Sequence, residues 1–78
     1  MLTLSEAKEG QWLRVTHTKG DEITVQALRF GIGAGSHIQV QKNISGGPVV
    51  ISKNQMEIAI GRKLADCIHV QSDPGYSV

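Results

Sequence analysis

Residues 30–40 read FGIGAGSHIQV, and this stretch sets the pattern of the fold. Three glycines alternate with small apolar residues over 31–35, and Ile38 and Val40 then alternate with polar side chains. Alternation with a period of two predicts a β-strand with one buried face. A nucleotide-binding loop needs its glycines after a strand and before a helix, which is the reverse order. The stretch therefore predicts a turn that leads into a strand over 36–43.

A short helix is expected just before this turn. Ile23, Ala27 and Phe30 fall at helical spacing. Asp21 is the expected N-cap, and Gly31 stands where a helix C-terminus favours a left-handed residue. A helix this short is marginal in water by itself. It must therefore gain its stability by packing on a sheet.

Short alternating strands account for most of the remaining chain. Further strands are predicted over 12–18, 49–51, 56–60 and 68–70. Two local turns complete the pattern, a capping box of Thr3 and Glu6 at the start and a helical turn over 61–66. About five strands with one short helix in the first long connection predict a mainly β fold, a small, partly closed barrel. Closure would remove exposed strand edges.

Length and charge limit the function. The 78 residues suffice for one domain, with 8 Lys and Arg dispersed among 7 Asp and Glu. Nucleic-acid binding and membrane-surface binding are not expected, because both use clustered basic residues. The longest apolar run, 48–51, is far shorter than the ~20 residues that cross a bilayer. We expect a domain over 1–71 and a mobile tail over 72–78, which contains Pro74 and Gly75.

Cysteine usage predicts the compartment. Cys67 is the only cysteine, so an intramolecular disulfide is excluded. The first residues lack a charged segment followed by a long apolar run, so no secretion signal is expected. The sequence therefore predicts a cytoplasmic protein.

The segment from 28 to 70 resembles the FeoA family. Residues 30–40 are similar to its helix end, glycine turn and alternating strand, and 47–51 to its next strand. Residues 58–65 resemble the family's closing pattern, with Ile68 and Val70 in the last strand. Leu4 and Gly10 fit its opening turn.

This resemblance implies an SH3-like barrel that acts in bacterial ferrous iron uptake. The family implies a cytoplasmic accessory protein that partners FeoB, a membrane iron transporter with a cytoplasmic GTP-binding domain. The same fold forms the C-terminal domain of iron-dependent repressors of the diphtheria-toxin-repressor type. This chain lacks a helix-turn-helix segment, which favours the free-standing accessory protein.

An enzyme is not expected. Catalysis needs a nucleophile or an acid–base pair in a cleft. All seven carboxylates fall in turns or on polar faces, where capping and solubility are their expected roles: Glu6, Glu9, Asp21, Glu22, Glu57, Asp66 and Asp73.

Transition-metal binding is the alternative function. Cys67 and His69 are two residues apart on a strand, which places both on one face, and thiolate and imidazole are suitable ligands for iron or zinc. A structural zinc site needs four ligands, so Asp66, His17, His37 or a second chain would have to complete it. The competing interpretation is that both residues merely flank buried Ile68 and Val70. The sequence requires no cofactor, and it is compatible with either a monomer or an oligomer.

Partner binding is the preferred function, with Trp12 as its candidate anchor. If Leu13 and Val15 face the core, Trp12 and Arg14 face outward, where a large aromatic is a preferred interface residue. Val50 is likewise out of phase with its neighbours, and Arg29 lies on the short helix. The alternative is that the second face of the strand is covered by the helix or the tail.

Overall fold

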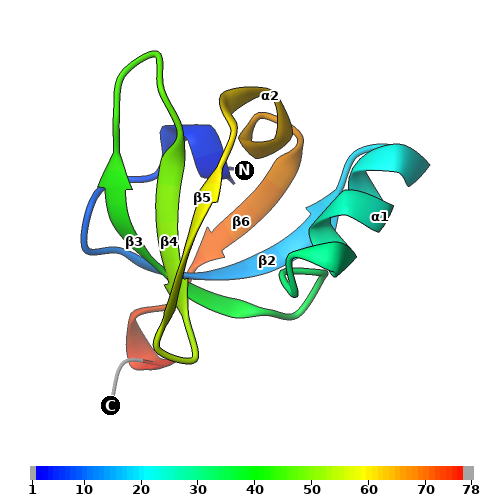
Figure 1. Cartoon of the computed structure of the whole chain (residues 1–78). Helices are drawn as coiled ribbons and strands as arrows, with labels where there is room; N and C mark the ends of the chain where they lie inside the picture. The colour runs from blue at the N-terminus through cyan, green and yellow to red at the C-terminus, as the bar shows by residue number, and fades with distance from the viewer. Residues whose placement is uncertain (1, 77–78) are drawn as a thin grey trace.

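The computed structural model describes residues 2–76 and places six strands in one antiparallel sheet. The strands are β1 Leu2–Thr3, β2 Trp12–Thr18, β3 His37–Asn43, β4 Val49–Lys53, β5 Met56–Ile60 and β6 Ile68–Ser72. The helices are α1 Asp21–Arg29 and α2 Arg62–Ala65, with 3₁₀ turns η1 Leu4–Glu6 and η2 Pro74–Tyr76. The sheet order β1-β6-β2-β3-β4-β5 curls into a partly closed barrel (Figure 1).

The mainly β, partly closed fold predicted from the sequence is confirmed, with one strand more than expected. The additional strand is β1, in which Leu2 and Thr3 pair with Val70 and His69 of β6. Two residues are too few to display an alternating pattern. This strand is therefore defined by its partner rather than by its own sequence.

The helix ends are set by local chemistry. The expected N-cap was wrong: Gly20, with φ of 99°, is the N-cap, and Asp21 is the first helical residue. An acidic side chain in the first turn still stabilises the helix, because its negative charge interacts favourably with the helix dipole. At the other end Gly31 has φ of 76°, as predicted for a left-handed C-terminal cap. The expected capping box in η1 is also present, because the Thr3 N–H donates to Glu6 Oε1 at 2.9 Å.

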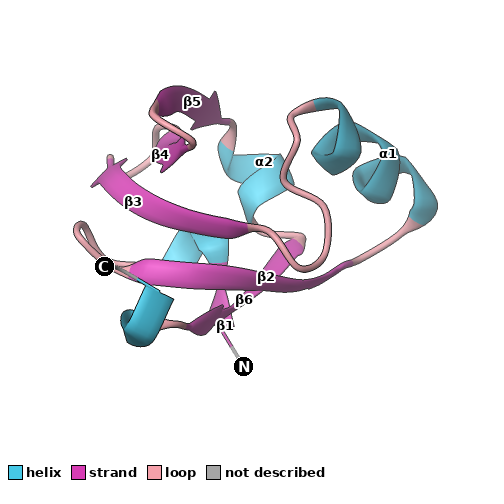
Figure 2. Cartoon of the chain, turned by 90° about the horizontal axis from the view of Figure 1, so that it is seen from below, coloured by secondary structure: helices cyan, strands magenta, loops and turns pink. Residues whose placement is uncertain are grey.

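The core lies inside the barrel and is aliphatic. Its fully buried large side chains are Leu4, Leu13, Val15, Ile32, Ile38, Val40, Val49, Ile51, Ile60, Ile68 and Val70. Helix α1 contributes only Ala27 as a buried residue, with Ile23 partly buried against the core. Its Val25 and Leu28 are 49% and 62% exposed. The helix therefore projects beside the barrel and contacts it along a narrow stripe (Figure 2).

The side chain of Arg62 links three segments of the barrel by hydrogen bonds. Its guanidinium donates to the carbonyls of Gly47 at 3.0 Å and Ser5 at 3.1 Å, and to that of Ile44. It also donates to Asn43 Oδ1 at 2.9 Å, and Asn43 Nδ2 donates back to Ser5 O at 2.9 Å. We call these five residues the Arg62 cluster. It joins η1, the β3–β4 turn and α2, which are distant in the sequence.

The segment expected to form a tail begins inside the sheet. Ser72 is the last residue of β6 and pairs with Leu13, and the η2 turn follows. The domain therefore continues past the boundary expected at residue 71. The mobility of residues 73–76 stays a prediction, and residues 77 and 78 lie outside the described part of the chain.

Candidate functional site

The candidate partner surface is built on β2 and β3. Trp12 pairs with Gln39 and Arg14 pairs with His37 across these strands. Leu13 and its neighbours point into the core, so the alternate side chains point away from it. We call this side of β2, β3 and β4 the outer face. It contains Trp12, Arg14 and Val50, the three strand residues that were predicted to face outward.

The C-terminal residues 73–76, which we call the C-terminal strap, cover part of this outer face. The ring of Tyr76 lies 5.8 Å from that of Trp12, at an interplanar angle of 56°. The backbone N–H of Asp73 donates to the Trp12 carbonyl at 2.8 Å. Of the two interpretations left open for Trp12, the structure supports partial cover, and that cover comes from the tail. Trp12 is accordingly half-buried.

The other predicted partner residues are only partly brought together. Arg14 lies on the outer face, where its guanidinium donates to Gln71 Oε1 at 3.3 Å. Val50 of β4 is half-buried, between its strand partners on β3 and β5. Arg29 is exposed in the last turn of α1, which lies beside the barrel. The binding roles of these residues stay predictions.

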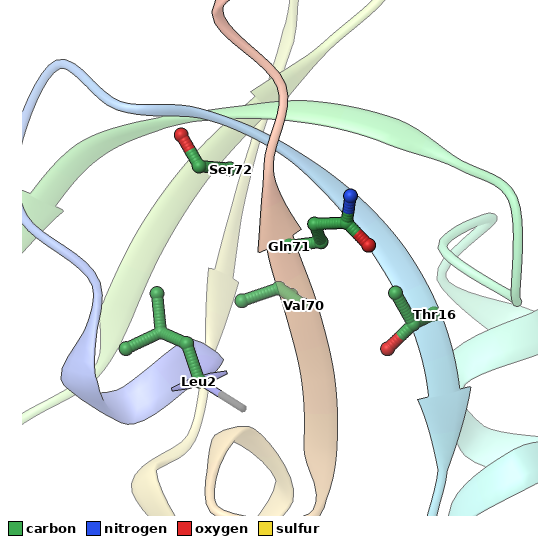
Figure 3. Close-up of a pocket in the computed structure, with 5 residues that line it drawn as sticks. All are labelled: Leu2, Thr16, Val70, Gln71 and Ser72. Carbon is green, nitrogen blue, oxygen red and sulfur yellow. The ribbon is translucent and has the colours of Figure 1, made fainter.

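Two hollows flank the outer face. One, of about 290 Å³, lies between the rings of Trp12, His37 and Tyr76 and residues 52–55 of the β4–β5 hairpin. The other, of about 630 Å³, is mainly apolar and is lined by Leu2, Thr16, Val70, Gln71 and Ser72. Figure 3 shows Leu2 and Val70 on one side of β6, and Thr16 and Gln71 on the other.

Near the metal candidates Cys67 and His69, the structure places one further histidine, His17, against His69. Cys67 is a half-buried free thiol just before β6. The His69 ring stacks on that of His17, with centroids 4.2 Å apart and planes within 7°. The buried Nδ1 of His69 has no hydrogen-bond partner within residues 2–76. Because imidazole coordinates in its ring plane, two parallel stacked rings cannot direct their lone pairs at one ion.

The remaining candidate ligands have other partners. His37 Nδ1 contacts Asp73 Oδ2 at 2.7 Å, and Asp66 accepts a short hydrogen bond from the Ser5 hydroxyl. Over the described part of the chain, the structure holds no group of three His, Cys, Asp or Glu side chains able to bind a metal ion. An ion at Cys67 and His69 would therefore need ligands from elsewhere.

A family model for the FeoA domain matches residues 2–72. The chain belongs to the FeoA family. The family is associated with iron transport, and it is an accessory family rather than a known enzyme family. The resemblance noted in the sequence is thereby confirmed.

Solved structures agree with this FeoA assignment. The crystal structure of an iron uptake regulatory protein (FeoA) is 30% identical, with a TM-score of 0.82, over 92% of this chain and 96% of that one. The FeoA protein from Chlorobium tepidum is 25% identical, with a TM-score of 0.77, over 91% of this chain and 70% of that one. A search of curated proteins found no match.

The same fold occurs inside larger proteins. ScaR with bound Cd²⁺ is 22% identical, with a TM-score of 0.79, and this chain spans 35% of its length. At this identity the likeness concerns the fold alone, and the SH3-like architecture expected for a FeoA domain is confirmed. No helix within residues 2–76 is both long and apolar enough to cross a membrane.

Three residues of this FeoA domain's outer face were not identified from the sequence as acting together. They are His37, Asp73 and Tyr76, and they meet because the strap folds back onto β2 and β3. One signal was available, since Tyr76 is the only tyrosine of the chain and the only aromatic residue of the expected tail. Nothing in the pattern indicated which strand that ring would contact.

Proposed function

We propose that this chain is a cytoplasmic accessory protein of ferrous iron uptake that binds the GTP-binding domain of a FeoB-type transporter. Membership of the FeoA family over residues 2–72 is the observation that carries the proposal. The binding surface we assign is the outer face, with Trp12 as its anchor. Tryptophan and arginine are enriched among residues that dominate binding energy, and Trp12 and Arg14 lie on the same strand face.

The chemistry of the domain favours binding over catalysis. No polar or charged residue among those described is fully buried. A catalytic carboxylate usually relies on a dehydrated setting that shifts its pKa. The surface instead offers half-buried aromatic and polar groups beside a hollow of about 290 Å³. We therefore infer that the domain is a protein-interaction module rather than an enzyme.

Calorimetric titration with the GTP-binding domain tests the proposal. Saturable heat with the purified chain, with or without a GTP analogue, is the expected result. A difference between the two nucleotide states would indicate a regulatory role. Absence of heat in every nucleotide state would contradict direct binding to this domain.

The variant Trp12→Ala tests the assigned surface. We expect at least about a tenfold loss of affinity, the equivalent of 1.4 kcal/mol, because aromatic anchors dominate interfaces. Phe30→Ala is the matched control, since Phe30 is an exposed aromatic (43%) outside the outer-face strands. Far-UV circular dichroism must show that both variants fold. Equal losses from both variants would argue against the outer face.

Transition-metal binding at Cys67 and His69 is the second candidate function. It is favoured by the unpartnered, buried Nδ1 of His69. Because no third ligand is close within residues 2–76, an iron or zinc ion would be shared between two chains.

Zinc and ferrous iron titrations of the wild type and the Cys67→Ala/His69→Ala variant decide this candidate. We expect metal uptake with a stoichiometry of one ion per two chains, lost in the double variant. His37→Ala serves as the control, because His37 already contacts Asp73. Unchanged metal uptake in the double variant would rule out these ligands.

A further inference from the structure

The C-terminal strap reaches the outer face through two side chains three residues apart. His37 Nδ1 lies 2.7 Å from Asp73 Oδ2, and because an ionised carboxylate can only accept, the imidazole N–H donates. The ring of Tyr76 stacks on the same imidazole, with centroids 3.8 Å apart and planes within 3°. One histidine therefore binds both a carboxylate and an aromatic ring.

Trp12 forms the second wall of this site. Its ring lies 5.8 Å from that of Tyr76, so the tyrosine ring contacts both the indole and the imidazole. Its backbone carbonyl also accepts the hydrogen bond from the N–H of Asp73. Trp12 and His37 thus contact a backbone N–H, a carboxylate and an aromatic ring of one short segment of this chain.

The strap occupies the site without being part of the core. Tyr76 remains 47% exposed, and none of the strap residues belongs to the buried core. A hollow of about 290 Å³ remains beside the rings and is also lined by residues 52–55 of the β4–β5 hairpin. Figure 1 shows the tip of this hairpin next to the C-terminal turn. A short tether supplies a segment at a millimolar effective concentration, so a few surface contacts suffice to hold it there.

We propose that Trp12 and His37 form a binding site for a peptide in which a carboxylate is followed, three residues later, by an aromatic ring. The C-terminal strap is its built-in competitor, and the partner segment displaces the strap. The peptide site specifies the chemistry of the partner that the proposed function assigns to the outer face. To that extent it rests on the proposed function. A peptide probe tests the site without the transporter, so the two proposals can fail separately.

An isotope-labelled full-length variant with an empty site is the test protein. Asp73→Ala/Tyr76→Ala removes the carboxylate and the aromatic ring of the strap but keeps the backbone N–H of residue 73. The probe is the blocked peptide Ac-SDPGY-NH₂, which copies residues 72–76. We expect saturable shifts of the Trp12 indole and residue 37 signals, with a dissociation constant on the order of 1 mM. Binding to the wild type should be about twofold weaker, because a strap at a millimolar effective concentration competes with a segment of millimolar affinity.

Two controls make the result specific. The peptide Ac-SNPGA-NH₂, which lacks the carboxylate and the ring, should give no shifts. Adding His37→Ala to the empty-site variant should abolish binding of the original peptide. If the double variant loses its dispersed amide spectrum, Tyr76→Ala alone opens the stacking position and replaces it.

Three results would overturn the proposal. Equal affinity of the wild type and the empty-site variant would show that the strap does not compete. No shift at Trp12 up to about 10 mM peptide would show that no such site exists. A wild-type dimer that the empty-site variant does not form would show that the strap binds a second copy of this chain instead of a partner.

Discussion

The Arg62 cluster and the outer face both join segments that are distant in the sequence, but they do so by different means. Arg62 is partly buried and donates to three backbone carbonyls and one side-chain oxygen. The contacts that hold the strap include the Asp73 carboxylate, the exposed Tyr76 ring and a backbone hydrogen bond from Asp73. Removing the arginine takes away the donor of the Gly47 carbonyl and of Asn43 Oδ1, whereas water can replace the strap. This difference separates structural contacts from replaceable ones.

Removal of Arg62 should have the largest effect. Arg62→Ala removes four hydrogen bonds, and hydrogen bonds from charged groups contribute about 1.5–3 kcal/mol each. The Gly47 carbonyl and Asn43 Oδ1 lose their donor, whereas the Ser5 and Ile44 carbonyls keep those from Asn43 Nδ2 and the Gly47 N–H. We expect a loss of about 3 kcal/mol in the free energy of unfolding, because such losses are not additive. Urea denaturation measures it. Lys63→Ala, an exposed neighbour in α2, should stay within about 0.5 kcal/mol of the wild type.

Removal of the Tyr76 ring should have a smaller effect on stability. Tyr76→Ala loses two ring contacts at a half-exposed position, for which we expect about 0.5–1 kcal/mol. Trp12 is the only tryptophan, so its emission reports on the strap without a label. Its maximum should shift to longer wavelength in the folded variant as water reaches the indole. A loss comparable to that of Arg62→Ala would remove the distinction between the two regions.

The smallest effect is expected from Glu6, which fixes the η1 turn that carries Ser5. Hydrogen bonds from the Thr3 backbone N–H, and then from its hydroxyl, lower the pKa of Glu6 below its ordinary value. A lowered folded-state pKa adds stability above the unfolded pKa, about 4.3, and this is lost as pH falls through the folded value. The melting temperature of Glu6→Gln should therefore lie slightly below that of the wild type at neutral pH. The two should converge as pH falls below the unfolded pKa and through the lowered folded-state pKa of Glu6. A constant difference would contradict the pKa shift.

The candidate site was less predictable from sequence than the fold. Alternation of Leu13 and Val15 with polar residues identified β2, and Gly31 identified the end of α1, because both signals are local. The outward direction of Trp12 followed from the same alternation. Its cover by Tyr76 depends on a contact between residues 64 positions apart, which no local pattern encodes.

The role of Arg62 could likewise not be predicted from the sequence. In the stretch 61–66 it resembles a solvated turn residue next to an exposed lysine. Its hydrogen bonds reach η1 and the β3–β4 turn, whose carbonyls become neighbours only after the barrel curls. Strand β1 also depends on a distant segment, because its two residues form a strand only where they pair with β6.

By itself, the sequence determined the mainly β architecture, the strand faces, the capped turns and the FeoA family resemblance. These depend on backbone preferences and on side-chain periods that act over a few residues. Only the tertiary structure decided which distant groups meet: Arg62 with the carbonyls of η1 and the β3–β4 turn, His17 with His69, and the strap with Trp12 and His37. Such contacts are fixed by the curvature and register of the whole sheet, which no single segment specifies.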